Sequence, residues 1–128
     1  MLGELDVDGG VLICDLEAGV GTVLRMLPGQ VDVVLVIAEP TVKSIEVARR
    51  AAQIGSGRAR VVVVANRVRG EADVEVVRAA LGDHELAVVP EEPAIQRADE
   101  DGVAPLDAAP ESAGVRAIVE LAERLVGS

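Results

Sequence analysis

The sequence predicts an α/β fold in which a mostly parallel sheet of about four strands is flanked by helices in three layers. Four short runs are rich in Val, Ile and Leu without polar alternation, which is typical of strands buried on both faces. Each run is followed by a stretch that can form a helix, and this order favours parallel strands with right-handed crossovers. The length of 128 residues fits one domain over 1–128. The runs are Val11–Cys14, Val33–Ala38, Val61–Ala65 and Leu86–Val89.

The first two connections differ in length. The first crossover, Thr22–Leu27, is short and stops at a Pro-Gly pair. The second is expected to be a helix from about Val42 to Ile54. Thr41 can cap the start of that helix, and Gly55 can end it in the left-handed conformation.

The later helices also have start and stop signals. One is expected from about Ala72 to Leu81 and ends at Gly82, and a short one is expected around Ala94–Asp99 between prolines. The last helix can be capped by Ser112 and carries one apolar stripe at helical spacing. The stripe consists of Val115, Ile118, Val119, Ala122, Leu125 and Val126.

Composition excludes several classes of function. Half of the residues are apolar but none is aromatic, so the core must be aliphatic and the stacking surface of single-strand nucleic-acid binders is missing. The net charge of −10 opposes binding to nucleic acid and acidic membranes. The single cysteine, Cys14, fits a reducing cytoplasm. No apolar run reaches the length of a membrane span, and the first residues do not combine a basic region with a long apolar stretch as a secretion signal does. We therefore expect a cytoplasmic protein with neither nucleic-acid nor membrane partners.

The first candidate motif is an aspartate that closes the first apolar run, followed four positions later by a glycine. In phosphate-hydrolysing folds, an aspartate such as Asp15 holds the water shell of Mg²⁺, and a glycine such as Gly19 donates its backbone N–H to the terminal phosphate. The alternative is an aspartate that caps a turn, with glycine for a positive φ. Because the pattern is short, taken alone it favours the turn.

The second candidate site is at the ends of the third and fourth runs. Asn66, the chain's only asparagine, lies where the third strand should end, and ligands of open α/β sheets bind at such ends. Its carboxamide can donate to and accept from an adenine edge at once. Pro90 and Glu91 follow the fourth run and could flank a base. The alternatives are a turn at Asn66 and an acidic, proline-rich connector after the fourth strand.

Other polar residues give weaker signals. His84, the only histidine, lies in a polar turn and has no second metal-ligating residue nearby, so no metal is expected beyond Mg²⁺ at Asp15. Glu39-Pro40-Thr41 is interpreted as a turn and helix cap. A receiver-like domain is disfavoured because the only lysine, Lys43, follows the second run rather than the last.

Taken in order, the motifs resemble the deviant-Walker P-loop ATPases of the MinD, ParA and CooC type, and the CooC type most. The similarity covers about Gly10 to Val126. The segments that carry it are D-L-E-A-G, E-P-T-V-K-S-I-E, V-V-V-V-A-N-R-V-R and V-V-P-E-E-P-A-I-Q-R-A-D-E-D-G-V-A-P-L.

The resemblance implies ATP and Mg as cofactors and assigns a role to each candidate residue. Asp15 matches the Walker B aspartate, Gly19 the switch glycine beside the γ-phosphate, and Asn66 the adenine-reading asparagine. Pro90 and Glu91 match the loop on the other side of the adenine. The family role would be ATP-dependent metallocentre maturation or partitioning.

The sequence departs from the family in one large respect. The family begins with a strand and a K-G-G-x-x-K-[ST] loop, and the 128 residues contain neither this loop nor the general pattern G-x-x-x-x-G-K-[ST]. We therefore expect the C-terminal portion of such a domain, unable to hydrolyse ATP alone. In the family the P-loop strand lies between the strands that match Val11–Cys14 and Val33–Ala38. Either these two pair directly, or another chain fills the gap.

Two functions remain open from the sequence. The first is a partial ATP-binding domain, completed by a full-length homologue or within a homo-oligomer that supplies the missing strand and loop. The second is a non-catalytic interaction module that reuses the fold and docks on a partner protein.

Overall fold

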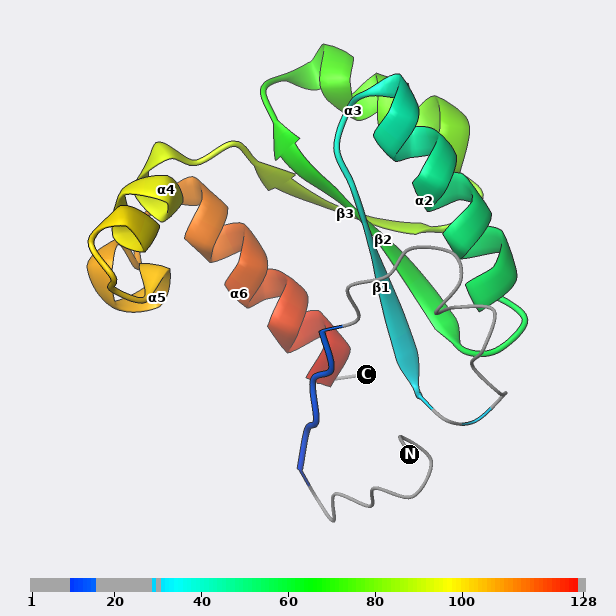
Figure 1. The fold of residues 1–128 in the computed structure, drawn as a ribbon, viewed down its shortest axis with the longest axis horizontal. Coiled ribbons are helices and arrows are strands. Elements are labelled where there is room, and N and C mark those ends of the chain that lie inside the picture. The colour runs from blue at the N-terminus through cyan, green and yellow to red at the C-terminus, as the bar shows by residue number, and fades with distance from the viewer. Residues whose placement is uncertain (1–9, 16–28, 30, 127–128) are drawn as a thin grey trace.

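The computed structural model describes residues 10–15, 29 and 31–126, which form three parallel strands alternating with helices (Figure 1). The α/β class is confirmed. The elements are β1 (Val33–Ala38), α2 (Val42–Gly55), β2 (Arg60–Val68), α3 (Glu71–Leu81), β3 (Glu85–Pro90), α4 (Pro93–Glu100), α5 (Pro105–Ala108) and α6 (Ala113–Val126). No helix in these ranges is long and apolar enough to cross a bilayer.

The strands lie in the order β1-β2-β3, with helices on both faces of the sheet (Figure 1). Helices α2 and α3 cover one face and form the main core with it; α6 lies on the other face, against β3. The main core is built only from Val, Leu and Ala, as the absence of aromatic residues requires. Its fully buried members include Val63, Val77 and Leu81.

The second face of the sheet is covered unevenly. Leu35 is aligned with Val62 and Ile37 with Val64, so these four side chains share the face opposite α2 and α3. Val62 and Val64 are 0% and 3% exposed, whereas Leu35 and Ile37 are 42% and 54% exposed. On this face, the side chains of β2 are therefore covered, whereas those of β1 are exposed to solvent.

The start of α2 and the end of α3 follow the sequence signals. The Thr41 hydroxyl accepts a hydrogen bond from the Ser44 N–H at 3.2 Å, and α3 stops before Gly82, as predicted. The prediction for Gly55 is wrong, because this residue is buried within α2 and the helix closes on Ser56 at φ −63°. No left-handed residue is needed there, since the Arg58 guanidinium donates to the Ile54 carbonyl at 2.8 Å.

The start of α6 differs from the prediction in its cap. Ser112 precedes the helix, but its hydroxyl donates to the Ala109 carbonyl at 2.8 Å. The Gly114 N–H instead donates to the Glu92 carboxylate at 3.0 Å, and the same side chain accepts from the Ala94 N–H at 3.5 Å. One carboxylate therefore caps both α4 and α6, which fixes the two helix starts beside each other.

The prediction of a strand at Val11–Cys14 is wrong. These residues form no regular structure, and Val11, Leu12 and Ile13 are 66%, 50% and 86% exposed. Direct pairing with β1 is therefore also wrong, and within the described ranges β1 is an edge strand of three, not a central strand of four. An apolar run forms a buried strand only where a neighbouring strand takes up its backbone hydrogen bonds, and no strand among the described residues pairs with Val11–Cys14. The predicted first crossover, Thr22–Leu27, lies outside the described residues.

Candidate functional site

The carboxyl ends of all three strands border one open hollow of about 370 Å³. The hollow is reached by the first residues after β1 and β3 and by the end of β2, which is where open parallel sheets bind ligands. We call it the strand-end hollow. It is lined by Glu39, Pro40, Thr41, Arg67, Arg69, Asp73 and Glu91.

Arg67 enters the strand-end hollow because β2 contains a bulge. Asn66 is aligned with Val89 and Val68 with Pro90, so Arg67 is an extra residue with no partner in β3. Its φ of 58° is left-handed, a conformation that costs an L-residue roughly 1–2 kcal/mol. The extra residue returns Val68 to the main core at 6% exposure and directs Arg67 out of the end of the sheet.

Charged side chains connect the three strand ends across the strand-end hollow. The Arg67 guanidinium lies 3.5 Å from the Glu39 carboxylate and 3.8 Å from that of Glu91. Arg69 Nε lies 3.5 Å from Glu91, and the Arg69 N–H donates to the Asp73 carboxylate at 3.0 Å. These ion pairs are largely exposed, so each contributes at most about 1 kcal/mol and acts mainly on orientation.

Three of the predicted site residues are brought together beside the strand-end hollow. Asn66 and Pro90 lie at the paired ends of β2 and β3, and the Glu91 N–H donates to the Val68 carbonyl at 2.9 Å. We call Asn66, Pro90 and Glu91 the base-side cluster. Only Glu91 lines the strand-end hollow itself; Asn66 is half-buried on the opposite face from the main core. Their predicted contact with adenine stays a prediction.

The predicted phosphate side is not assembled in the described residues. Asp15 is exposed, belongs to no helix or strand and does not line the strand-end hollow, and Gly19 lies outside the described residues. Across 10–15, 29 and 31–126, no three His, Cys, Asp or Glu side chains converge as metal ligands. Within the described residues, no group is therefore placed to hold nucleotide phosphates or Mg²⁺.

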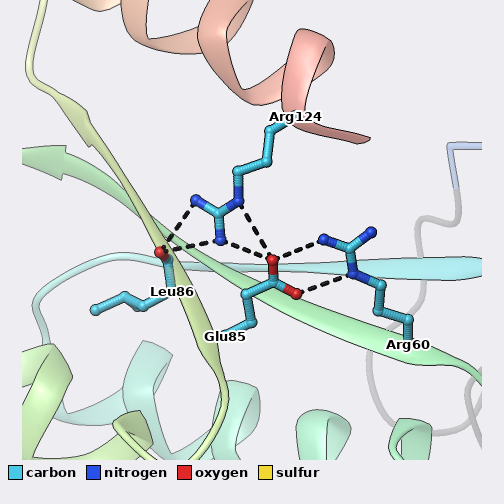
Figure 2. Close-up of polar contacts among 4 residues, drawn as sticks. All are labelled: Arg60, Glu85, Leu86 and Arg124. Atoms are coloured by element: carbon cyan, nitrogen blue, oxygen red, sulfur yellow. Dashed lines mark hydrogen bonds and ion pairs between the residues drawn. The ribbon is translucent and has the colours of Figure 1, made fainter. Parts of the chain in front are cut away.

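A second polar cluster lies at the opposite, amino-terminal end of the strands (Figure 2). The Glu85 carboxylate accepts hydrogen bonds from Arg60 at 2.7 and 2.9 Å and from Arg124 at 2.9 and 3.3 Å. These bonds, first from Arg60 and then from Arg124, lower the pKa of Glu85 to about 2. Because Arg60 belongs to β2, Glu85 to β3 and Arg124 to α6, the cluster holds the end of α6 on the sheet.

Comparison with known proteins agrees with this architecture. The MinD septum site-determining protein of Pyrococcus horikoshii, solved with Mg-ADP, superposes with a TM-score of 0.63 at 20% identity, over 75% of this chain and 42% of that one. MinD of Aquifex aeolicus gives 0.62 at 24% identity, over 77% and 45%. The chain has a MinD-like α/β fold. The closer resemblance to the CooC type stays a prediction.

One curated protein matches most of the chain in sequence. An uncharacterised ATP-binding protein of Methanocaldococcus jannaschii is 28% identical over 123 residues, which cover 92% of this chain. No protein-family model matches the chain. The chain spans 47% of the length of that relative and 42–45% of the two MinD chains, so it corresponds to less than half of each.

Sequence reasoning missed the residues that line most of the strand-end hollow. Arg67 and Arg69 come within three residues of Asn66. A regular alternation of side chains along β2 gives no sign of the bulge at Arg67. The sequence pattern at Glu39 indicates only a turn, although Glu39 follows β1 just as Glu91 follows β3. A charged residue directly after each buried strand was the available signal.

Proposed function

We propose that the chain forms the base-binding half of a MinD-like ATP-binding domain, and that nucleotide phosphates are held by residues outside it. The observation that carries the proposal is the base-side cluster, located at the carboxyl end of a sheet with the MinD-like fold. The MinD of P. horikoshii was solved with Mg-ADP, and the M. jannaschii relative is described as ATP-binding. These names support an adenine nucleotide as the ligand class.

The chemistry of the base-side cluster suits a purine edge. The Asn66 carboxamide offers one acceptor and two donors, which match the adjacent acceptor and donor of adenine. Pro90 can cover part of the base with its ring, and the Glu91 N–H is already bonded to Val68. With no aromatic side chain in the sequence, no stacking interaction strengthens base binding.

The phosphate side leads to the opposite expectation. The 128 residues contain no match to the phosphate-binding pattern G-x-x-x-x-G-K-[ST], and their net charge of −10 repels phosphates. A protein of these residues should therefore bind adenosine as well as ATP and should not hydrolyse ATP. Base contacts alone support a Kd of about 1 mM, which corresponds to roughly 4 kcal/mol.

The test compares two ligands by ¹⁵N NMR titration. Adenosine and Mg-ATP should shift the Asn66 side-chain amide and the Glu91 amide, with Kd values within about threefold of each other. Asn66→Leu, which keeps the approximate size of the side chain and removes its carboxamide without adding a charge, should weaken both equally, while Gln53→Leu at an exposed position on α2 should change neither. Micromolar affinity for Mg-ATP, measurable turnover, or no adenosine-dependent shift at Asn66 would each contradict the proposal.

The open edge of β1 favours a second candidate function, an interaction module that associates through this strand. Leu35 and Ile37 leave an apolar strip beside an edge with no neighbouring strand in the described ranges, and such edges accept further strands. The occupant that we propose for the purified protein is a second copy, with the two β1 edges paired about a two-fold axis. A homologue that carries the phosphate loop would compete for the same edge.

Light scattering over a range of concentrations tests this association. The wild type should form dimers at high concentration, and Ile37→Lys should stay monomeric because it places a charge on the exposed strip. Val42→Lys is the matched control, since Val42 is 89% exposed and belongs to α2 rather than to β1. A wild type that is monomeric throughout, or an Ile37→Lys variant that still dimerises, would overturn the proposal.

A further inference from the structure

Arg67 is the only non-glycine residue with a left-handed φ in the part of the chain that the structure describes. The bulge itself has a clear role, because one extra residue is needed to return Val68 to the main core. Glycine or asparagine would adopt this backbone conformation more easily than arginine. The shape of the strand therefore explains an extra residue but does not explain why it is an arginine.

The arginine side chain supplies what the bulge alone does not. Its two terminal nitrogens approach different strands, one facing Glu39 after β1 and the other Glu91 after β3. A glycine or asparagine at this position would leave the ends of β1 and β3 without a link across β2. Arg67 is thus the one side chain of the strand-end hollow that contacts the carboxylates of both neighbouring strands.

Glu91 is where this link meets the base-side cluster. Its carboxylate lies near Arg67 and Arg69, at 3.8 and 3.5 Å, and its N–H is bonded to Val68. The hydrogen bond from the Glu91 N–H to the Val68 carbonyl fixes the position of the Pro90–Glu91 segment along β2. The side-chain contacts of Glu91 with Arg67 and Arg69 join the same segment to the end of β2.

We propose that Arg67 is a positioning residue, which holds the Pro90–Glu91 segment opposite Asn66 and thereby sets selectivity for adenine over guanine. This rests on the proposed function of the base-side cluster. Adenine and guanine differ in the donors and acceptors on the edge that Asn66 would contact. If the Pro90–Glu91 segment is held at a fixed distance from Asn66, a base can bind the carboxamide in only one arrangement, which suits adenine. If the segment can move, both adenine and guanine can be accommodated. Loss of Arg67 therefore lowers selectivity more than affinity.

The experiment measures the ratio of guanosine to adenosine Kd by NMR titration of the full chain. Arg67→Asn keeps a residue that tolerates the left-handed backbone and removes the guanidinium. It should reduce the ratio at least fivefold, while the adenosine Kd changes less than threefold. Arg67→Lys, which keeps one positive charge near Glu91, should restore part of the ratio. Arg78→Asn removes an equal charge from α3, where Arg78 pairs with Glu75, and should leave the ratio unchanged.

A second readout separates this proposal from the proposed function. The ¹⁵N order parameter of the Glu91 amide, measured without nucleoside, should fall in Arg67→Asn and stay at the wild-type value in Arg78→Asn. A wild type that binds neither nucleoside would overturn the base-binding function and, with it, the selectivity role. An unchanged order parameter in Arg67→Asn, or an unchanged ratio where adenosine does bind, would overturn the positioning role alone.

Discussion

Gly114→Ala should destabilise the protein by about 1–3 kcal/mol, although alanine is normally the better helix residue. A Cβ at this position would lie 2.9 Å from Glu92 Cγ and 3.3 Å from Ile95 Cδ1, and still closer to Glu92 Cβ. Relieving such overpacking costs about 1–3 kcal/mol. Moving Glu92 away also weakens the bond to the Gly114 N–H, and a lost cap costs about 1 kcal/mol. The helix propensity of alanine offsets about 0.5–1 kcal/mol of this.

Urea unfolding followed by far-UV circular dichroism is the assay, since the sequence has no aromatic residue for fluorescence. The midpoint should fall by about 1 M for a slope of about 1–3 kcal/mol per molar urea. Gly70→Ala is the control. Its Cβ meets nothing within 4 Å and its φ of 173° is extended, so the change should stay within about 0.5 kcal/mol.

A double-mutant cycle identifies the cause of the destabilisation. Glu92→Ala alone removes the shared cap of α4 and α6 and should cost about 1 kcal/mol. In that background Gly114→Ala should still destabilise, because residue 92 keeps the Cβ that lies nearest. It should cost less than in the wild type, since Cγ is gone and no cap remains to be lost. Full additivity, or a Gly114→Ala variant as stable as the wild type, would refute the reasoning.

Two further predictions concern the core and the cluster around Glu85. Leu81→Ala leaves a cavity at a fully buried position in the main core and should lower the free energy of unfolding by about 2–5 kcal/mol, measured by urea unfolding. Leu106→Ala, at a side chain that is 58% exposed, should lower it by less than about 0.5 kcal/mol. Equal effects would contradict the assigned core. Because the pKa of Glu85 is lowered to about 2 in the folded state, its stabilisation is complete above pH 4.5 and is lost as the pH falls towards 2. Glu85→Gln should therefore be less stable than the wild type at pH 7, with the difference shrinking by pH 3; a constant difference would show that Arg60 and Arg124 do not act on the charge.

The sequence predicted the elements whose signals are local. The apolar run Val33–Ala38 is β1 residue for residue, and Thr41 and Gly82 bound α2 and α3 as expected. Buried strands and helix caps depend on a few neighbouring residues, so periodicity and capping chemistry are enough to find them. The α/β class followed from the order of these elements.

The features that the sequence did not predict depend on distant residues. The cap of α6 comes from Glu92, 22 positions before Gly114, and displaces the local candidate Ser112. The run Val11–Cys14 has the composition of a strand, but composition cannot supply the neighbour that a strand needs. Arg67 was missed because a left-handed arginine is imposed by pairing with β3 and by burial of Val68, neither of which is local.

The bulge in β2 also acts on the folding of the sheet. Side chains before Arg67 and side chains after it are out of step by one position, so that Val63, Ala65 and Val68 reach the same core. If β2 shifted by one residue along β3, its valines would exchange faces. The bulge could then not place the residues before Arg67 and Val68 after it in the same core. The extra residue thus favours a single register between β2 and β3. Uniform valine runs could pair in several registers, but only one of them places the bulge at Arg67 and Val68 in the main core.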